Sequence, residues 1–221
     1  PLANKLNIKF NTKIVEIKRY ASHVEISDSN GNIYKSKVVL VTVPLAILKN
    51  NIIKFNPPLN EEISNSINKL AVFDMNKVFI EFEQKFWGDT DFITFLPNKD
   101  DLILCALAIN FHKVNDKNLL IFLISSETSI NKIQSEISKF GEEFVKSKYE
   151  NILKLSYPDK NIKITKFKVT SWNTDEFSLG SFSEIGGDSN DRAKFHIVEN
   201  RTYFAGEHTS LTYNAFVYGA F

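Results

Sequence analysis

The first fifty residues alternate apolar and polar positions as half-exposed strands do. Residues 11–20 and 22–28 each predict a strand, residues 29–32 predict a turn, and a third strand follows. The run 38–43 is different because its first four residues are all apolar, so neither face of the strand is polar. This predicts a strand covered on both sides. Pro44 ends this run, since proline fixes φ and lacks an N–H.

The middle of the chain mixes helical and strand patterns. Residues 60–70 place apolar side chains at helical spacing behind two acids, which predicts a helix. Residues 125–158 predict an amphipathic helical region that Ser126 or Thr128 could cap. Four segments predict strands of one sheet: "NKVFIEFEQKFW", "FITFLP", "LILCALAI" and "NLLIFLIS".

The last sixty residues predict a strand at 161–172, a polar loop at 173–192 and a short apolar strand at 201–208. Residues 213–221 have the small and apolar residues of a closely packed helix. This predicted helix stops after about two turns, so its own stability is expected to be low. The whole chain is thus predicted to be α/β, with α and β elements mixed.

Composition narrows the function only a little. The 221 residues are 43% hydrophobic and 24% charged, which indicates a soluble globular protein. The net charge of +1 produces no overall electrostatic field that would attract nucleic acid. No segment reaches the ~20 apolar residues of a membrane span. Cys105 is the single cysteine, so zinc binding by a cysteine cluster is excluded and no metal is predicted. The compartment stays open, with cytoplasm or nucleus favoured.

Four separated segments carry a family resemblance: "VTVPLAILK" with "FNPPL" after it, "NKVFIEFEQKFW", "SWNTDEFSLGSFS" and "FAGEHTS...Y...V.GA". Their order and spacing resemble the C-terminal half of a flavin-containing amine oxidase, in the group of polyamine oxidases and lysine-specific histone demethylases. The resemblance implies a two-domain FAD-linked fold. Residues 1–50 and 171–221 would belong to a discontinuous FAD-binding domain, and 51–170 to a substrate domain of sheet plus helices.

One family motif is absent. The G-x-G-x-x-G fingerprint cradles the pyrophosphate of the dinucleotide on backbone N–H groups, and the eight glycines never take that spacing. We therefore expect a fragment whose partner is the missing N-terminal half of the FAD domain. Alone, it should bind FAD poorly and be inactive.

The resemblance assigns residues to the flavin end of the cofactor. Glu207 would lie beside the ribityl chain and accept hydrogen bonds from hydroxyls, and Gly206 would let the backbone approach the cofactor. Residues 213–220 would begin a helix whose amides face the flavin ring, with backbone groups near Phe216 and Val217 touching it.

The resemblance also assigns catalytic and substrate-binding roles. Lys77 matches a lysine that holds a water at flavin N5 and assists the reaction with oxygen. Trp172 would line the flavin face, whereas Phe177, Phe182 and Phe216 would line the substrate channel and form an apolar cage for the amine.

At the adenine end, the backbone amide of Ile14 would contact the base. Thr42, Val43 and Pro44 match a strand end near the nucleotide. The alternative interpretation is that they are ordinary strand residues of a buried sheet without a role in binding.

The resemblance implies hydride transfer to flavin from the carbon beside a secondary or tertiary amine, with oxygen reduced to hydrogen peroxide. The substrate would be a small-molecule polyamine or a methyl-lysine peptide, and the lack of an inserted helical tower favours the polyamine. Two alternatives stay open: a non-catalytic remnant or interaction domain, and a flavin desaturase or porphyrinogen oxidase.

Overall fold

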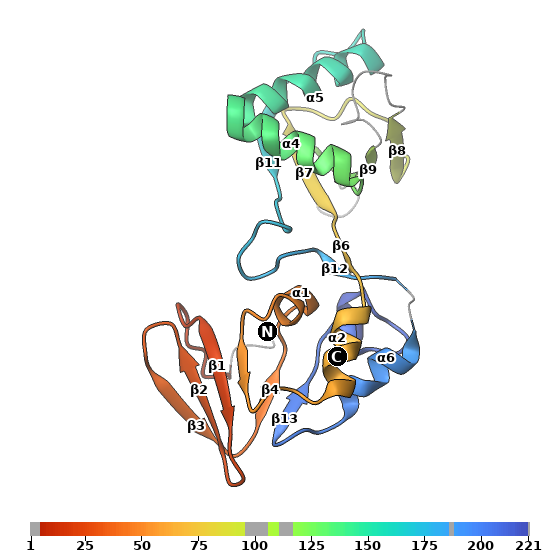
Figure 1. The fold of residues 1–221 in the computed structure, drawn as a ribbon. Helices are drawn as coiled ribbons and strands as arrows, with labels where there is room; N and C mark the ends of the chain where they lie inside the picture. The colour runs from red at the N-terminus through yellow and green to blue at the C-terminus, as the bar shows by residue number, and fades with distance from the viewer. Residues whose placement is uncertain (1–4, 96–105, 111–116, 186–187, 221) are drawn as a thin grey trace. The chain divides into compact units, whose positions relative to one another are not determined.

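The computed structural model describes residues 5–95, 106–110, 117–185 and 188–220, and it divides into two compact units (Figure 1). The first unit combines Pro1–Phe73 with Glu176–Phe221, and the second is Asp74–Asp175. Each unit has its own hydrophobic core. The predicted mixture of α and β elements is confirmed.

A four-stranded sheet opens the first unit. Its strands are β1 (Ile14–Arg19), β2 (Val24–Asp28), β3 (Ile33–Ser36) and β5 (Lys54–Asn56), in the order β3-β2-β1-β5. The Asp28 carboxylate closes the predicted turn by accepting the N–H groups of Asn30 and Asn32, both at 2.9 Å. The three predicted strands and their turn are therefore confirmed.

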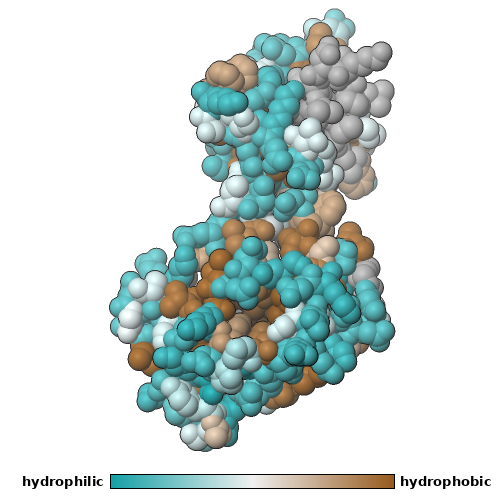
Figure 2. All heavy atoms as spheres, in the orientation of Figure 1, coloured by the Kyte–Doolittle hydropathy of each residue, from teal (hydrophilic) through white to brown (hydrophobic). Residues whose placement is uncertain are grey.

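A second, two-stranded sheet pairs β4 (Val39–Val41) with β13 (Thr202–Phe204) in parallel. The prediction that this strand is covered on both sides is wrong for the described residues, because Leu40 is 59% exposed and Val38 is 46% exposed. Among those residues β4 has one neighbouring strand, and only the face that carries Val41 enters the core. Apolar residues accordingly reach the surface of this unit between polar patches (Figure 2).

Two helices complete the core of the first unit. They are α1 (Leu45–Lys49) and α2 (Glu61–Lys69), and the second confirms the helix predicted at 60–70. Buried residues of both helices pack against the strands, so this stretch of the first compact unit continues to Phe73; the predicted domain division near residue 50 stays a prediction. The core comprises Ile17, Val41, Leu45, Ile47, Leu48, Ile53, Ile63, Ile67, Leu70, Phe195 and Phe204.

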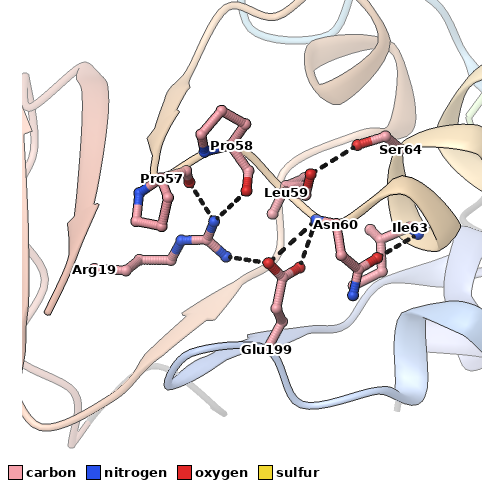
Figure 3. Close-up of polar contacts among 8 residues, drawn as sticks. All are labelled: Arg19, Pro57, Pro58, Leu59, Asn60, Ile63, Ser64 and Glu199. Atoms are coloured by element: carbon pink, nitrogen blue, oxygen red, sulfur yellow. Dashed lines mark hydrogen bonds and ion pairs between the residues drawn. The ribbon is translucent and has the colours of Figure 1, made fainter. Parts of the chain in front are cut away.

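A buried arginine joins three segments of this unit (Figure 3). The Arg19 side chain is fully buried and donates to the carbonyl oxygens of Pro57 and Pro58. It also pairs with Glu199 at 3.0 Å, and the Glu199 carboxylate accepts the backbone N–H of Asn60. The start of α2 is thereby tied both to β1 and to the segment before β13.

The second unit is an antiparallel sheet with two helices. The sheet order is β11 (Ile164–Val169), β7 (Asn76–Phe82), β10 (Leu119–Ile124), β9 (Ala106–Asn110) and β8 (Phe92–Phe95). Along β7 every second residue is buried, as its alternation predicted. Parts of two predicted strands, with Cys105, lie outside the described residues.

The helical region predicted at 125–158 is two helices, α4 (Glu127–Phe140) and α5 (Glu142–Ser156). Gly141 separates them with φ +85, a conformation that suits glycine. Ser126 stands at the N-cap of α4 but makes no side-chain cap bond. Both helices bury apolar residues against the sheet, including Ile130, Val145 and Tyr149. None of the described helices is long and apolar enough to span a membrane.

Short elements fill the rest of the first unit. They are β6 (Val72–Phe73), β12 (Phe182–Ser183), α6 (Ser189–Ala193), and the 3₁₀ turns η2 (Lys194–His196), η3 (Glu207–Thr209) and η4 (Val217–Ala220). The predicted helix at 213–220 is wrong: up to residue 220 the segment holds only η4. Ala215 has φ +68, which interrupts a right-handed helix, and its N–H is bonded to Glu207.

Candidate functional site

Glu207 is the centre of a compact group of polar contacts, which we call the Glu207 cluster (Ser183, Arg192, Glu207 and Ala215). Its first carboxylate oxygen accepts the Ser183 N–H at 2.8 Å. Its second accepts the Ser183 hydroxyl at 2.7 Å and the Ala215 N–H at 2.5 Å. One carboxylate thus joins β12, η3 and the segment that leads to η4.

Arg192, on α6, is the cation of this cluster and is 1% exposed. It donates to the Ser183 hydroxyl oxygen at 3.0 Å and to the His208 carbonyl at 2.9 Å. Its other terminal nitrogen donates to the Glu184 carbonyl at 2.8 Å. Burial lowers the pKa of Arg192, whereas the charges of Glu207 and Glu184 raise it. The Ser183 hydroxyl therefore connects a buried cation to the Glu207 carboxylate.

His208 packs beneath the cluster as a neutral ring. It is 2% exposed, and burial lowers its pKa to about 4; Glu207 opposes that shift and Arg192 adds to it. Its ring meets the Phe195 ring edge-on at 5.2 Å. Gly206 has φ +135, and a Cβ there would lie 3.0 Å from the His208 ring. Glycine is therefore required at 206 by the backbone angle and by the neighbouring histidine.

The Glu207 carboxylate has limited room for a further donor. A carboxylate offers about four lone-pair sites. Three hydrogen bonds from the chain itself already use three of them. The cluster consequently fits a cofactor that presents a single hydroxyl to Glu207.

Three of the residues predicted for the adenine end come together in one hollow. Ile14, Thr42 and Val43 line a cavity of about 320 Å³ whose walls are mainly apolar side chains of β1, β2 and β4. A neighbouring cavity of about 210 Å³ shares Ile14 and Val43. A mainly apolar hollow of this kind fits a flat, weakly polar ring such as adenine. Pro44 lies outside both linings and stands at the N-cap of α1.

The predicted cage residues of the first unit each have a neighbour of their own. Phe177 is 56% exposed and lines the smaller cavity, with the Lys13 ammonium 5.7 Å from its ring centre. Phe182 stacks on Phe73 at 5.3 Å. Phe216 stacks on Tyr218 at 5.2 Å, and Val217 is exposed. Their role toward a substrate stays a prediction.

Lys77 and Trp172 both lie in the second unit, and the backbone of each is held by a neighbouring residue. The Lys77 N–H donates to the Thr170 hydroxyl oxygen at 2.8 Å, and the Thr170 N–H donates to the Lys77 carbonyl at 2.9 Å. The Trp172 N–H donates to the side chain of Asn76 at 3.0 Å. Lys77 is half-buried, and the Trp172 side chain lies largely at the surface.

Sequence reasoning missed the partners that hold these residues. Arg192 carried one available signal, because it is one of three arginines in a chain whose basic residues are otherwise lysines. Asn76 carried another, because it is a polar residue at an inward position of an alternating strand. Ser183 and Thr170 gave no signal of this kind. Within the described residues, no cluster of histidine, cysteine and carboxylate side chains could hold a metal ion.

Comparison with known proteins decides the family. The model of the flavin containing amine oxidoreductases matches residues 2–221. The chain belongs to this family. The resemblance read from four segments is thereby confirmed, and membership of a flavin-containing family supports FAD as the cofactor.

Individual relatives match along all or nearly all of the chain. Polyamine oxidase 3 of Oryza sativa subsp. japonica is 30% identical over 100% of this chain and 44% of its own length. A protein of Oryza sativa subsp. indica named lysine-specific histone demethylase 1 homolog 3 is 30% identical over 100% of this chain and 28% of its own length. Polyamine oxidase 1 of Zea mays is 26% identical. The chain spans less than half the length of these relatives.

Proposed function

We propose that the protein containing this chain is an FAD-dependent amine oxidase that acts on a polyamine. The observation that carries the proposal is the family match over residues 2–221. Proteins named polyamine oxidases from rice and maize are among its relatives, and each matches nearly all of this chain. The substrate class rests on those names.

The reaction has a simple electron balance. When bound, the flavin supplies the acceptor for a hydride from the carbon next to a secondary or tertiary amine nitrogen. Water then adds to the imine and releases an aldehyde and a shorter amine. Oxygen would be the final acceptor of the two electrons and, with two protons, would be released as hydrogen peroxide.

The residues of this chain have distinct roles in the proposal. Ile14, Thr42 and Val43 hold the adenine in their apolar hollow. Glu207 accepts one ribityl hydroxyl with its remaining lone pair. The Lys77 ammonium holds a water and stabilises the negative charge that develops on oxygen. The aromatic residues Trp172, Phe177, Phe182 and Phe216 exclude water and line the path of the amine.

Cofactor binding provides the first test. We expect the full-length protein to carry flavin absorbance and the 221-residue chain to be colourless, because none of the eight glycines supplies the pyrophosphate fingerprint. Spermine added under nitrogen should bleach the flavin, and air should restore the colour with release of peroxide. A full-length protein that stays colourless with added FAD would instead indicate a non-catalytic remnant.

The role of Lys77 can be tested separately. Lys77→Met keeps the length of the side chain and removes the charge, so reoxidation of the reduced protein by oxygen should slow by about tenfold or more, while reduction by spermine changes less. Lys166→Met is the matched control, because Lys166 is an exposed lysine of the adjacent strand that pairs with Glu81. Equal effects of the two substitutions would exclude the proposed role.

A methylated lysine is the second candidate substrate, and one observation favours it: the relative named as a histone demethylase homologue is as similar in identity as the first polyamine oxidase. Anaerobic bleaching by a dimethyl-lysine histone peptide, with no bleaching by spermine, would select this alternative.

A further inference from the structure

A buried asparagine occupies a position of β7 where the strand pattern calls for an apolar residue. Asn76 is 4% exposed and lies on the same inward face as Val78, Ile80 and Phe82. Asparagine is disfavoured in strands, and burying its amide is costly unless the amide is hydrogen-bonded. A local rule broken inside a well-ordered core is expected where function requires it.

The Asn76 amide is bonded on both sides. Its oxygen accepts the Trp172 N–H at 3.0 Å and is approached by the Thr170 hydroxyl at 3.5 Å. Its nitrogen donates to the side-chain oxygen of Asn173 at 3.4 Å. Three residues that follow β11 are thus fixed by one side chain from β7.

The contacts extend from Asn76 to a helix. Gln134, on α4, donates to the same Asn173 oxygen at 2.6 Å, and the Asn173 nitrogen lies 3.5 Å from the Gln134 oxygen. We call Asn76, Gln134, Thr170, Trp172 and Asn173 the Asn76 network. A strand, a helix and the loop after β11 are held together by polar contacts that all lie in the second unit.

The network begins where the pairing of β7 with β11 stops, while β7 stays paired with β10 as far as Asn76. The last paired residues of β7 and β11 are Val78 and Val169. Beyond them, Thr170 bonds both the N–H and the C=O of Lys77. The Asn76 network therefore continues the contacts between β7 and the segment after β11 as far as Trp172, which the proposed function uses.

We propose that Asn76 is a positioning residue for amine oxidation: it fixes the backbone of Trp172 against the end of β7 that carries Lys77. This inference rests on the proposed function. Asn76 acts through its neighbours. An apolar residue of similar size would fill the space but leave the Trp172 N–H unpaired, which explains why asparagine stands at this core position.

The first test measures position without turnover. In the full-length protein, Asn76→Ala should speed hydrogen exchange of the Trp172 amide by about tenfold or more, because its acceptor is removed. Asn110→Ala is the matched control: Asn110 is 3% exposed in the same sheet, and its side chain bonds the carbonyls of Gly88 and Thr90. Unchanged exchange at Trp172 in Asn76→Ala overturns the proposal, whether or not the protein is active.

The second test measures the two halves of the reaction. Asn76→Ala should slow oxygen-dependent reoxidation by about tenfold, whereas Asn110→Ala leaves it within about twofold. Asn76→Asp keeps the acceptor for the Trp172 N–H and should recover most of the rate. Equal losses in the two alanine variants, or no recovery with aspartate, overturn the proposal. A wild-type protein that neither spermine nor the methylated peptide reduces counts against the proposed function, and the exchange result still decides the role of Asn76.

A milder variant guards against misfolding of Asn76→Ala. Gln134→Ala removes the helix end of the network at a half-buried position. It should speed hydrogen exchange of the Trp172 amide by only about threefold, because Gln134 bonds Asn173 rather than Trp172. An exchange rate equal to that of the wild type in this variant also contradicts the proposal.

Discussion

Three arginines of the first unit form hydrogen bonds between segments that are distant in the sequence. Arg19 bonds the Pro57 and Pro58 carbonyls and pairs with Glu199, and Arg192 links three carbonyl and hydroxyl oxygens. Arg201 donates to the carbonyls of Ala21 and Lys37. A guanidinium offers several donors in a fixed plane, which a lysine cannot match. The rare arginines of this lysine-rich chain therefore have structural roles.

Glu207 offers the sharpest prediction at the residue scale. Glu207→Gln replaces one acceptor oxygen with a donor nitrogen among three donors, so the protein without FAD should lose about 1–3 kcal/mol of unfolding free energy. Urea denaturation measures this. Glu176→Gln is the control, since Glu176 is an exposed acid of the same unit that pairs only at the surface with Lys13. Equal unfolding free energies for the two variants would mean that Glu207 does not stabilise the fold and acts only as a cofactor contact.

His208 gives the protein a pH-dependent stability. Its pKa is about 4 in the folded protein, against 6.5 for an ordinary histidine. Between these values the unfolded chain binds a proton that the folded chain does not, so this contribution is complete above pH 6.5 and is lost as the pH falls to about 4. At about 1.4 kcal/mol per pH unit, the loss from this group is ~3 kcal/mol.

His208→Leu tests this dependence because it removes the titrating group and keeps an apolar side chain against Phe195. The variant should lose less unfolding free energy than the wild type between pH 7 and pH 4.5, measured by urea denaturation at each pH. Parallel losses in both proteins would show that other groups cause the acid sensitivity.

The N-cap residues of helices α2 and α4 differ in their hydrogen bonding and can be compared directly. The Asn60 side chain accepts the Ile63 N–H at 2.9 Å at the start of α2, whereas Ser126 makes no such bond at the start of α4. Asn60→Ala should therefore cost about 1 kcal/mol of stability, and Ser126→Ala only a few tenths. Chemical denaturation of both variants provides the comparison. A larger loss for the serine variant would contradict the assignment of the caps.

Elements with strong local periodicity were predictable. The alternation along β7 and the capped apolar stripe of α2 each record in neighbouring residues which face is buried. The break at Gly141 was not predicted, because the apolar spacing continues on both sides of it and only its φ of +85 shows the interruption. The segment 213–220 failed for a related reason: small apolar residues suit a helix, but the Ala215 N–H bonds a distant carboxylate instead.

At the scale of the whole molecule, two separate cores predict two responses to mutation. Ile63 in the first unit and Ile80 in the second are both 0% exposed, so each change to alanine should cost about 2–5 kcal/mol locally. Hydrogen exchange followed by mass spectrometry should show that Ile63→Ala weakens protection in the first unit and Ile80→Ala in the second. Loss of protection across both units from either variant would show that they unfold as one.

The sequence by itself determined the family, three of the four strands of the first sheet (β1, β2 and β3), the alternating strand β7 and the helix at 60–70. These properties are written in short-range spacing and in four motifs that keep their order. That Ile14, Thr42 and Val43 share one hollow is a finding of the structure, and their contact with adenine stays a prediction.

Only the tertiary structure decided what holds the candidate site. Glu207 meets Ser183 across 24 residues of sequence, and Asn76 meets Trp172 across 96. A hydrogen bond between such residues depends on how the folded chain brings distant segments within about 3 Å, and no local periodicity encodes that distance. The exposed face of β4 has the same origin, because burial of a strand depends on the elements packed over it rather than on its own composition.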